Sequence, residues 1–206
     1  MKYDEWEPLY LEICDYFDFD PAEDQRAAEL LTTLSSADAH TTLVERCKGK
    51  IITVCGNAPS LPEEARRCEG TIIAADGAAG VLLAQGIRPD IIVSDLDGID
   101  EYAIELNNTG TILVVHAHGD NVSRLKSWVP RFCGPLVLTT QGRPFLHIHN
   151  YGGFTDGDRA VFLAQECGAT QIVLIGFDCD DPCVTPMKKG KLIWTRRLLK
   201  LAGYDC

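Results

Sequence analysis

The sequence predicts an α/β fold built on a mainly parallel, doubly wound sheet. Six short apolar runs follow residue 50 and are separated by segments of about the length of a helix, which is typical of βαβ units. Within each run the apolar residues are consecutive rather than alternate, as in strands that helices cover on both faces. The runs are "IITVC", "TIIAA", "DIIVS", "TILVV", "LVLTT" and "QIVLIG". Ligands of such a sheet bind beyond the carboxyl ends of its strands.

Residues 1–49 predict a helical N-terminal extension that precedes an α/β domain at 50–206. Apolar side chains recur at the three-to-four spacing of a helix at Trp6, Leu9, Tyr10, Ile13 and Phe17. A second helix is expected after Asp20, which can cap it, with Pro21 in its first turn and Glu23 completing a capping box.

Length and composition limit the range of functions. The chain has 206 residues, 46% hydrophobic and 24% charged, which suits one globular domain with a sizeable core. It shows no long apolar run and no secretory start, so we expect a cytoplasmic protein without a membrane partner. A formal net charge of -11 argues against a nucleic-acid partner, because phosphate backbones select Lys and Arg.

The first strand runs into a glycine-containing turn, "CGNAPSLPEEA". Gly56 permits a tight turn, and Ser60 with Glu63 can form a capping box at the next helix. Backbone amides of this turn, around Gly56, Asn57 and Ser60, would then face an anion. The turn is neither a Walker loop nor a full dinucleotide fingerprint, so an ordinary capped turn explains it equally well.

Carboxylates stand at the carboxyl ends of the second and third strands. Asp76 follows the second strand, in "AADGAAG", and Asp95 and Asp97 follow the third, in "PDIIVSDLDGID". In an extended segment Asp95 and Asp97 point the same way, while Leu96 faces the core. Carboxylates this close repel one another and need a cation, and Mg²⁺ prefers hard oxygen ligands. Each Asp alone would be a helix cap, but three at adjacent strand ends predict a metal site.

A further polar group opens a predicted helix in "GGFTDGDRA", where Asp156, Asp158 and Arg159 follow Thr155. Arg159 either neutralises a phosphate or pairs with the neighbouring acid. The strand after this helix ends at Asp178, again at the ligand-facing edge of the sheet.

Two histidines in "HAHGDN" suggest a competing zinc hydrolase, and His147 and His149 repeat their spacing. The pattern is incomplete, because Asn121 stands where such sites usually have a further histidine. We therefore expect this segment to supply polar groups of the pocket, namely His116, His118, Asp120 and Asn121.

Nine cysteines are scattered along the chain, several of them in apolar segments, and predict free, mostly buried thiols. Cys179 and Cys183 have three residues between them, instead of the usual two of a zinc knuckle, so we do not expect a zinc site there.

The C-terminal tail is basic, although the rest of the chain is acidic. Lys188, Lys189 and Lys191 have few acids around them. Such a contrast predicts a local anion site, with the segment 185–191 lying over the phosphates of a nucleotide. The alternative is a tail whose charges are simply solvated.

Two long motifs resemble the thiamin pyrophosphokinases. They are "ADGAAGVLLAQGIRPDIIVSDLDG" and "TDGDRAVFLAQECGATQIVLIG", and together they span residues 50 to 180 roughly, in the order of that family. The chain departs from those enzymes after the last strand, where "GFDCDDP" replaces their Gly-Gly-Arg and Asp-His ending. The combination of "CGNAPSL", "SDLDG", "HAHGDN" and "GGFTDGDRA" is similar to the archaeal 6-hydroxymethyl-7,8-dihydropterin pyrophosphokinases, relatives of the thiamin enzymes.

The resemblance implies a thiamin-pyrophosphokinase-like catalytic domain that uses ATP, releases AMP and diphosphorylates a pterin alcohol for tetrahydromethanopterin or folate synthesis. It implies a homodimer, and Mg²⁺ held by Asp76, Asp95 and Asp97. It implies nucleotide binding by Gly56, Asn57, Ser60, Gly77, Lys188 and Lys191. Asp156 or Asp158 would orient the acceptor hydroxyl or a second ion, and Arg159 or a tail lysine would assist at the phosphates.

A pterin presents a 2-amino group beside a ring N–H, and a carboxylate can accept both hydrogen bonds. Asp178 is the first candidate for this role, because it stands where the sequence departs from the thiamin enzymes, and Asp120 is the second. The alternative functions are thiamin diphosphokinase, a nucleotide-sugar glycosyltransferase-like protein and a nucleotide-binding regulatory domain.

Overall fold

The structure, a computed structural model, describes residues 1–206. A seven-stranded sheet of order β6-β5-β4-β3-β2-β1-β7 forms its centre, and all of its strand pairs are parallel. The strands are β1 (Ile51–Cys55), β2 (Thr71–Ala75), β3 (Ile91–Ser94), β4 (Ile112–Ala117), β5 (Leu136–Thr140), β6 (Ile148–His149) and β7 (Gln171–Ile175). The predicted α/β fold is confirmed, and each of the six apolar runs forms a strand. The sequence does not predict β6, which is only two residues long.

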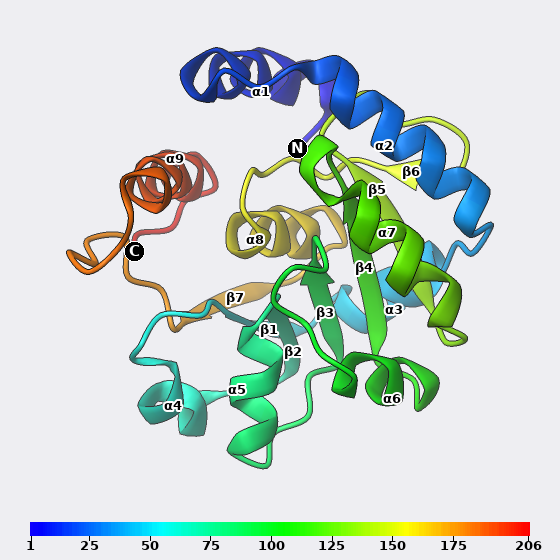
Figure 1. Ribbon diagram of the computed structural model, residues 1–206. Helices are drawn as coiled ribbons and strands as arrows, with labels where there is room; N and C mark the ends of the chain where they lie inside the picture. The colour runs from blue at the N-terminus through cyan, green and yellow to red at the C-terminus, as the bar shows by residue number, and fades with distance from the viewer.

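Nine α-helices surround the sheet (Figure 1). They are α1 (Tyr3–Phe17), α2 (Pro21–Leu34), α3 (His40–Cys47), α4 (Leu61–Glu64), α5 (Ala78–Ala84), α6 (Tyr102–Asn108), α7 (Val122–Trp128), α8 (Asp156–Glu166) and α9 (Pro186–Leu201). Short 3-10 turns lie at η1 (Ala65–Arg67), η2 (Gly119–Asn121) and η3 (Val129–Arg131). None of these helices combines the length and the apolar composition that a membrane span requires.

Helices bury both faces of the sheet. On one face α2, α4, α5, α6 and α7 share a core with strand residues such as Cys55 and Ile92. On the other face α3, α8 and α9 share a second core with strand residues such as Val54 and Val93. Neighbouring strand residues therefore face opposite cores, which is why the strands are apolar at consecutive positions.

The predicted helical N-terminal segment is present, and it packs into the same layers as the rest of the chain. Helix α2 belongs to one core and α3 to the other. Helix α1 packs with α8 and α9 in a third cluster, which contains Trp6 and Trp194 (Figure 1). A domain boundary at residue 50 stays a prediction, but the helices before it cover the sheet that follows it.

Two predicted caps have different outcomes. The Asp20 carboxylate accepts a hydrogen bond from the Ala22 backbone N–H at 2.9 Å and caps α2 as expected, although Glu23 forms an ion pair with Arg26 instead of completing the box. The predicted capping box at Ser60 is wrong. Ser60 already has helical backbone angles and its side chain makes no cap hydrogen bond, whereas an N-cap residue needs an extended conformation to reach the next turn.

The prediction of free thiols holds for seven cysteines and is wrong for two. Cys179 and Cys206 form a disulfide, with their Cα atoms 5.7 Å apart, which ties the end of the chain to the loop after β7. The sequence separation of 27 residues gave no sign of this pairing. Among the free thiols, Cys14, Cys47, Cys55 and Cys167 are buried.

Candidate active site

A pocket of about 700 Å³ opens at the carboxyl edge of the sheet. Its walls come from the loops after β1, β2, β3, β4, β5 and β7, from the first turns of α8 and α9, and from the connection between α1 and α2. Most of the predicted site residues line it: Gly56, Asn57, Asp76, Gly77, Asp95, Asp97, His118, Asp120, Asp156, Arg159, Asp178, Lys188 and Lys191. The predicted site residues Ser60, His116, Asn121 and Asp158 do not.

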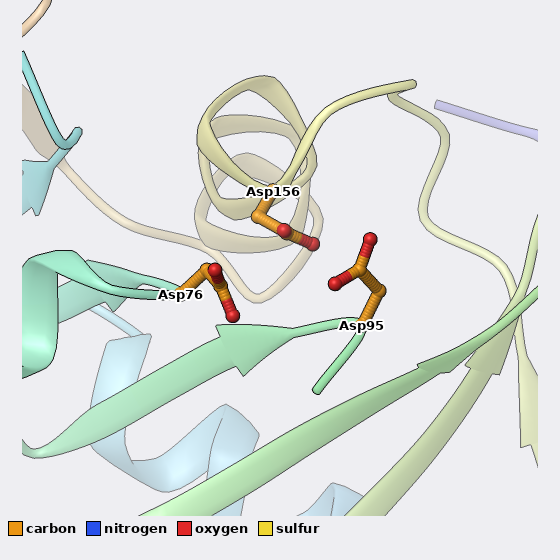
Figure 2. Close-up of side chains that lie close together, drawn as sticks. All are labelled: Asp76, Asp95 and Asp156. Atoms are coloured by element: carbon orange, nitrogen blue, oxygen red, sulfur yellow. The ribbon is translucent and has the colours of Figure 1, made fainter. Parts of the chain in front are cut away.

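Three carboxylates converge in the middle of this pocket. Asp76 follows β2, Asp95 follows β3 and Asp156 begins α8, and each offers an oxygen within 4.8 Å of the others (Figure 2). The third member is Asp156 rather than Asp97, which is exposed. The predicted extended arrangement of 95–97 is wrong, because β3 ends at Ser94 and Leu96 has a left-handed φ of 71°. Leu96 is buried as expected, but the turn takes Asp97 away from the group.

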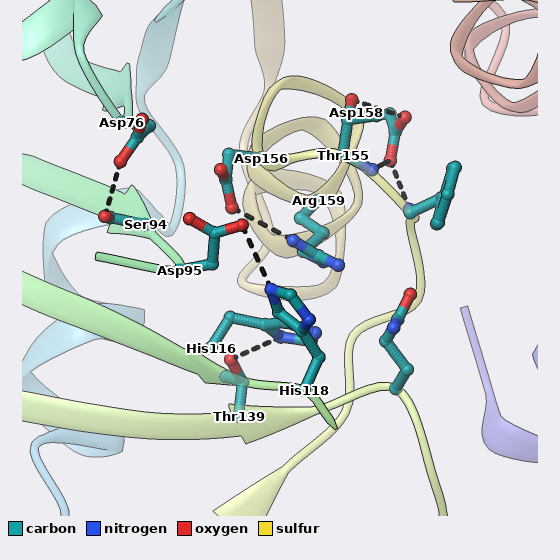
Figure 3. Close-up of polar contacts among 12 residues, drawn as sticks. Asp76, Ser94, Asp95, His116, His118, Thr139, Thr155, Asp156, Asp158 and Arg159 are labelled. Carbon is teal, nitrogen blue, oxygen red and sulfur yellow. Dashed lines mark hydrogen bonds and ion pairs between the residues drawn. The ribbon is translucent and has the colours of Figure 1, made fainter. Parts of the chain in front are cut away.

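Asp76 is held rigidly at the centre of the group. Its Oδ1 accepts a hydrogen bond from the Ser94 hydroxyl at 2.6 Å (Figure 3). The same oxygen accepts a hydrogen bond from the Gly98 backbone N–H at 3.2 Å. Burial raises the pKa of Asp76 to about 6, and the charges of Asp95 and Asp97 add to this effect while the Ser94 hydrogen bond opposes it. A cation bound among these carboxylates therefore competes with a proton at pH values below about 6.

Asp95 is supported by a histidine. The Asp120 backbone N–H donates to His118 Nδ1 at 3.3 Å, so the ring proton is on Nε2, which donates to Asp95 Oδ2 at 3.2 Å. Burial would raise the pKa of Asp95, but the His118 hydrogen bond and the charge of Arg159 outweigh it and hold this pKa below its ordinary value. Asp95 is therefore the member of the group that most readily stays ionised.

Asp156 has a cationic neighbour. Arg159 is buried, and its Nη1 donates to Asp156 Oδ1 at 3.0 Å (Figure 3). Burial and the charge of Asp95 nevertheless raise the pKa of Asp156 well above its ordinary value, against the attraction of Arg159. One guanidinium cannot balance three carboxylates, so the group retains negative charge that a divalent cation would neutralise. The expected alternative pair of Arg159 with the adjacent Asp158 is not formed, because Asp158 caps α8, and the ion pair that Arg159 makes is with Asp156.

Four predicted site residues do not line the pocket, and three of them make hydrogen bonds within the protein. Asp158 is fully buried and accepts hydrogen bonds from the backbone N–H groups of Phe154 and Thr155 and from the Thr155 hydroxyl, which completes a capping box at α8. Asn121 donates to the backbone oxygens of Asp95 and His116, and so fixes the loops on which the acids stand. His116 is buried with its Nδ1 3.0 Å from the Thr139 hydroxyl. Ser60 lies outside the pocket lining.

The structure does not support the zinc hydrolase alternative. His147 lies 2.9 Å from the Ser35 backbone oxygen, and His149 lies 3.0 Å from an Asp38 carboxylate oxygen. No histidine or cysteine joins a group of three potential metal ligands, since the one such group consists of Asp76, Asp95 and Asp156.

Cationic groups lie on one side of the pocket, near β1 and β7. Thr185 caps α9 by accepting a hydrogen bond from the Lys188 backbone N–H at 3.2 Å, so the positive end of this helix faces the pocket. Lys188 and Lys191 line the pocket, as do Gly56 and Asn57 of the loop after β1, whereas Lys189 does not.

Sequence reasoning missed the wall formed by the α1–α2 connection and by the loop after β5. Asp24 and Gln141 are buried residues of this wall. Asp24 gives no signal in the sequence, because an acid in a helix usually faces water. Gln141 follows the strand "LVLTT" directly. It therefore stands at the same ligand-binding edge of the sheet as the aspartates, and its position in the sequence is the signal that could have identified it.

Comparison with known proteins gives a consistent result. The family model described as 6-hydroxymethylpterin diphosphokinase MptE-like matches residues 25–182. Three archaeal relatives are each named 6-hydroxymethyl-7,8-dihydropterin pyrophosphokinase. The Pyrococcus furiosus protein is 44% identical over 185 residues, which are 86% of this chain and 78% of that protein. The Methanothermobacter thermautotrophicus protein is 40% identical, with 86% and 79% covered, and the Methanocaldococcus jannaschii protein is 37% identical, with 86% and 80% covered.

Proposed function

Because this chain belongs to the 6-hydroxymethylpterin diphosphokinase MptE-like family, we propose that its pocket transfers diphosphate from ATP to the hydroxymethyl group of 6-hydroxymethyl-7,8-dihydropterin. The products are AMP and the pterin diphosphate. The names of the relatives confirm the expected class of enzyme, and they favour the pterin over thiamin as the acceptor. The observation that carries the proposal is the group of Asp76, Asp95 and Asp156 beneath two lysines in one pocket.

Mg²⁺ fits the donor set of this pocket. Asp76, Asp95 and Asp156 offer hard oxygen ligands within 4.8 Å of one another, and no sulfur or imidazole ligand belongs to the group. When bound there, Mg²⁺ would neutralise phosphate charge and polarise the β-phosphoryl group. His118 holds the Asp95 carboxylate in place, and Ser94 does the same for Asp76.

The protein's part in the reaction is to position and to neutralise. The acceptor oxygen bonds to the β-phosphorus and gives up its proton to solvent, while the bond from that phosphorus to the α–β bridging oxygen breaks and AMP leaves with that oxygen. A loose transition state needs little help from a base. Arg159 lies close enough to Asp156 to hold it in one orientation, and its position at the pocket wall suits the negative charge of the transferring group.

We propose that the β1–β7–α9 side of the pocket binds the nucleotide phosphates. Gly56, Asn57 and Gly77 supply close-lying backbone, and Lys188 and Lys191 supply charge. Replacing Lys188 and Lys191 together by Ala should raise the KM for ATP by about tenfold or more, because each charge-assisted hydrogen bond is worth about 1.5–3 kcal/mol. Steady-state kinetics at saturating pterin measure this effect.

Lys189→Ala is the matched control for this pair. It removes one lysine charge from the same helical turn, where the double variant removes two, but its side chain does not line the pocket, so the KM for ATP should change little. An equal rise in the KM for ATP in the control and the double variant would show that the tail acts only through general charge.

One assay tests the function as a whole. The protein is incubated with ATP, Mg²⁺ and either the pterin alcohol, thiamin or no acceptor, and AMP is measured. We expect AMP and pterin diphosphate in equal amounts with the pterin and neither product with thiamin. Efficient diphosphorylation of thiamin would replace the proposed substrate, and binding of ATP without turnover of any acceptor would favour a regulatory nucleotide-binding domain.

Three further properties are proposed, the cytoplasmic location from the composition of the sequence and the other two from the resemblance to the family. They are a place in tetrahydromethanopterin or folate synthesis, a cytoplasmic location and assembly as a homodimer. A monomeric elution volume at working concentration would contradict the last of these.

A further inference from the structure

The two sides of the pocket differ in their chemistry. Lysines stand on the side of β1, β7 and α9, across the carboxylate group from the side of β4, β5 and α2. That second side is lined by His118, Asp120 and Gln141 of the loops and by acids of the α1–α2 connection and the first turn of α2, and its one cationic group is Arg159, which is paired with Asp156. It is therefore rich in hydrogen-bond acceptors and unsuited to phosphates, whereas a ring with donor groups on its edge would fit it.

Gln141 is the most tightly held residue of this second side. Its backbone oxygen accepts hydrogen bonds from Trp6 Nε1 at 2.9 Å and from Asn150 Nδ2 at 2.8 Å. Its side-chain Nε2 donates to Asp24 Oδ2 at 3.2 Å. Only 5% of the residue is exposed, although it lines the pocket. Both the position of the residue and the direction of its amide are thus determined by buried neighbours.

The hydrogen bond to Asp24 determines which atom of the Gln141 amide is left without a partner. An ionised Asp24 can only accept hydrogen bonds, so the amide must turn its NH₂ towards it and leave Oε1 on the other side. Asp24 is held in turn by other parts of the protein, because it also accepts hydrogen bonds from the Tyr10 hydroxyl at 2.7 Å and from the Gly119 backbone N–H at 2.8 Å. Helices α1 and α2 therefore hold the amide in one orientation.

Gln141 Oε1 has no hydrogen-bond partner in the protein. The chain contains three buried side-chain atoms of this kind, and the other two are His116 Nε2 and Arg159 Nε. His116 belongs to β4, Gln141 follows β5 directly and Arg159 is in the first turn of α8. Figure 3 shows His116 in contact with Thr139 of β5. A buried acceptor left unpaired costs free energy, which a donor from a ligand would recover.

We propose that Gln141 is a specificity-determining residue, whose Oε1 accepts a hydrogen bond from the amino group on the ring edge of the acceptor. The inference rests on the proposed function and adds the side of the pocket on which the acceptor lies. It places the ring between the carboxylate group and α2, so that the hydroxymethyl group points towards Asp156 and the nucleotide occupies the lysine side. The sequence assigned ring recognition to Asp178, but Asp178 is exposed and lies on the lysine side, after β7.

The test compares two acceptors in two proteins. The acceptors are 6-hydroxymethyl-7,8-dihydropterin and its analogue that lacks the 2-amino group, and the variant is Gln141→Met, which keeps the length of the side chain but removes the acceptor. We expect the wild type to prefer the pterin by about tenfold to a hundredfold in kcat/KM, and the variant to lose most of that preference. The KM for ATP should stay within about twofold, because Gln141 lies away from the lysines.

Gln165→Met is the matched control, since Gln165 is exposed on α8 and does not line the pocket. It should retain the wild-type preference. If Gln141→Met does not fold, Gln141→Asn withdraws the same amide by one methylene and should also lose the preference.

Three outcomes would overturn the inference. Equal use of both acceptors by the wild type would show that no buried group reads the amino group, and this result needs no variant. An equal fall of kcat/KM for both acceptors in Gln141→Met would show that the residue only supports the pocket. Loss of the preference in Asp178→Asn, with retention in Gln141→Met, would return recognition to Asp178. Absence of AMP with any acceptor is a separate result, which contradicts the proposed function itself.

Discussion

Replacing Asp95 by Asn is expected to lower the rate of AMP formation by about 10²–10³-fold while the fold stays intact. Asp95 is the carboxylate whose pKa is held below its ordinary value, so it contributes a full negative charge to the proposed Mg²⁺ site. Asn has the same shape and can still accept a hydrogen bond from His118, but it removes that charge. The measurement is the steady-state rate with saturating ATP, Mg²⁺ and pterin.

Asp97→Asn is the matched control, because it makes the same chemical change two positions further on, at an exposed residue outside the carboxylate group. Its loss of rate should be much smaller. Mg²⁺ should raise the melting temperature of the wild type, since a ligand that binds only the folded state stabilises it, and should do so less for Asp95→Asn. Near-normal turnover of Asp95→Asn would remove Asp95 from the metal site, and an equal loss in both variants would restore Asp97 to it.

Gly98→Ala should reduce activity on a similar scale, on the order of 10²-fold or more, without altering any charged residue. A Cβ added at Gly98 would overlap Asp76 Oδ2 and would lie 2.8 Å from Asp76 Cγ. The Asp76 carboxylate is also tied to the Ser94 hydroxyl, so it cannot swing aside without losing that hydrogen bond. We therefore expect the methyl group to push one ligand out of the carboxylate group.

Gly142→Ala provides the comparison for this variant. An added Cβ at Gly142 meets its nearest atoms at 3.7 and 3.8 Å, which is ordinary van der Waals contact. It should keep both its activity and its response to Mg²⁺. If Gly98→Ala retains wild-type turnover and the same stabilisation by Mg²⁺, the position of the Asp76 carboxylate is not critical and its assignment as a ligand is wrong.

Much of the fold follows from local patterns in the sequence. The consecutively apolar strands indicate that both faces of the sheet are covered, and Asp20 marks the start of α2. These features depend on residues that are close together in the chain. Strand β6 escapes prediction because its two residues pair with β5 through contacts that its own sequence does not encode.

The site is predicted less completely, because its geometry depends on single backbone angles and on contacts between distant residues. Asp76 and Asp95 are predicted correctly because each follows a strand at the ligand-binding edge of the sheet. The left-handed conformation of Leu96 keeps Asp97 out of the group of three, and no sequence pattern predicts that conformation. The same motif that opens α8 contains Asp156 and Asp158, of which one faces the pocket and the other caps the helix. Local sequence cannot decide between them, since both acids suit the first turn of a helix.

The place of β7 in the sheet bears on how the enzyme is made. Strands β1 to β6 join the sheet one after another in a single direction, whereas β7 returns to the free edge of β1 and pairs Gln171 with Ile51. During synthesis the edge of β1 therefore stays unpaired until β7 has left the ribosome. Lys188 and Lys191 come later still. The sheet is thus completed only when β7 has been made, and a nascent chain that stops before β7 leaves the edge of β1 open.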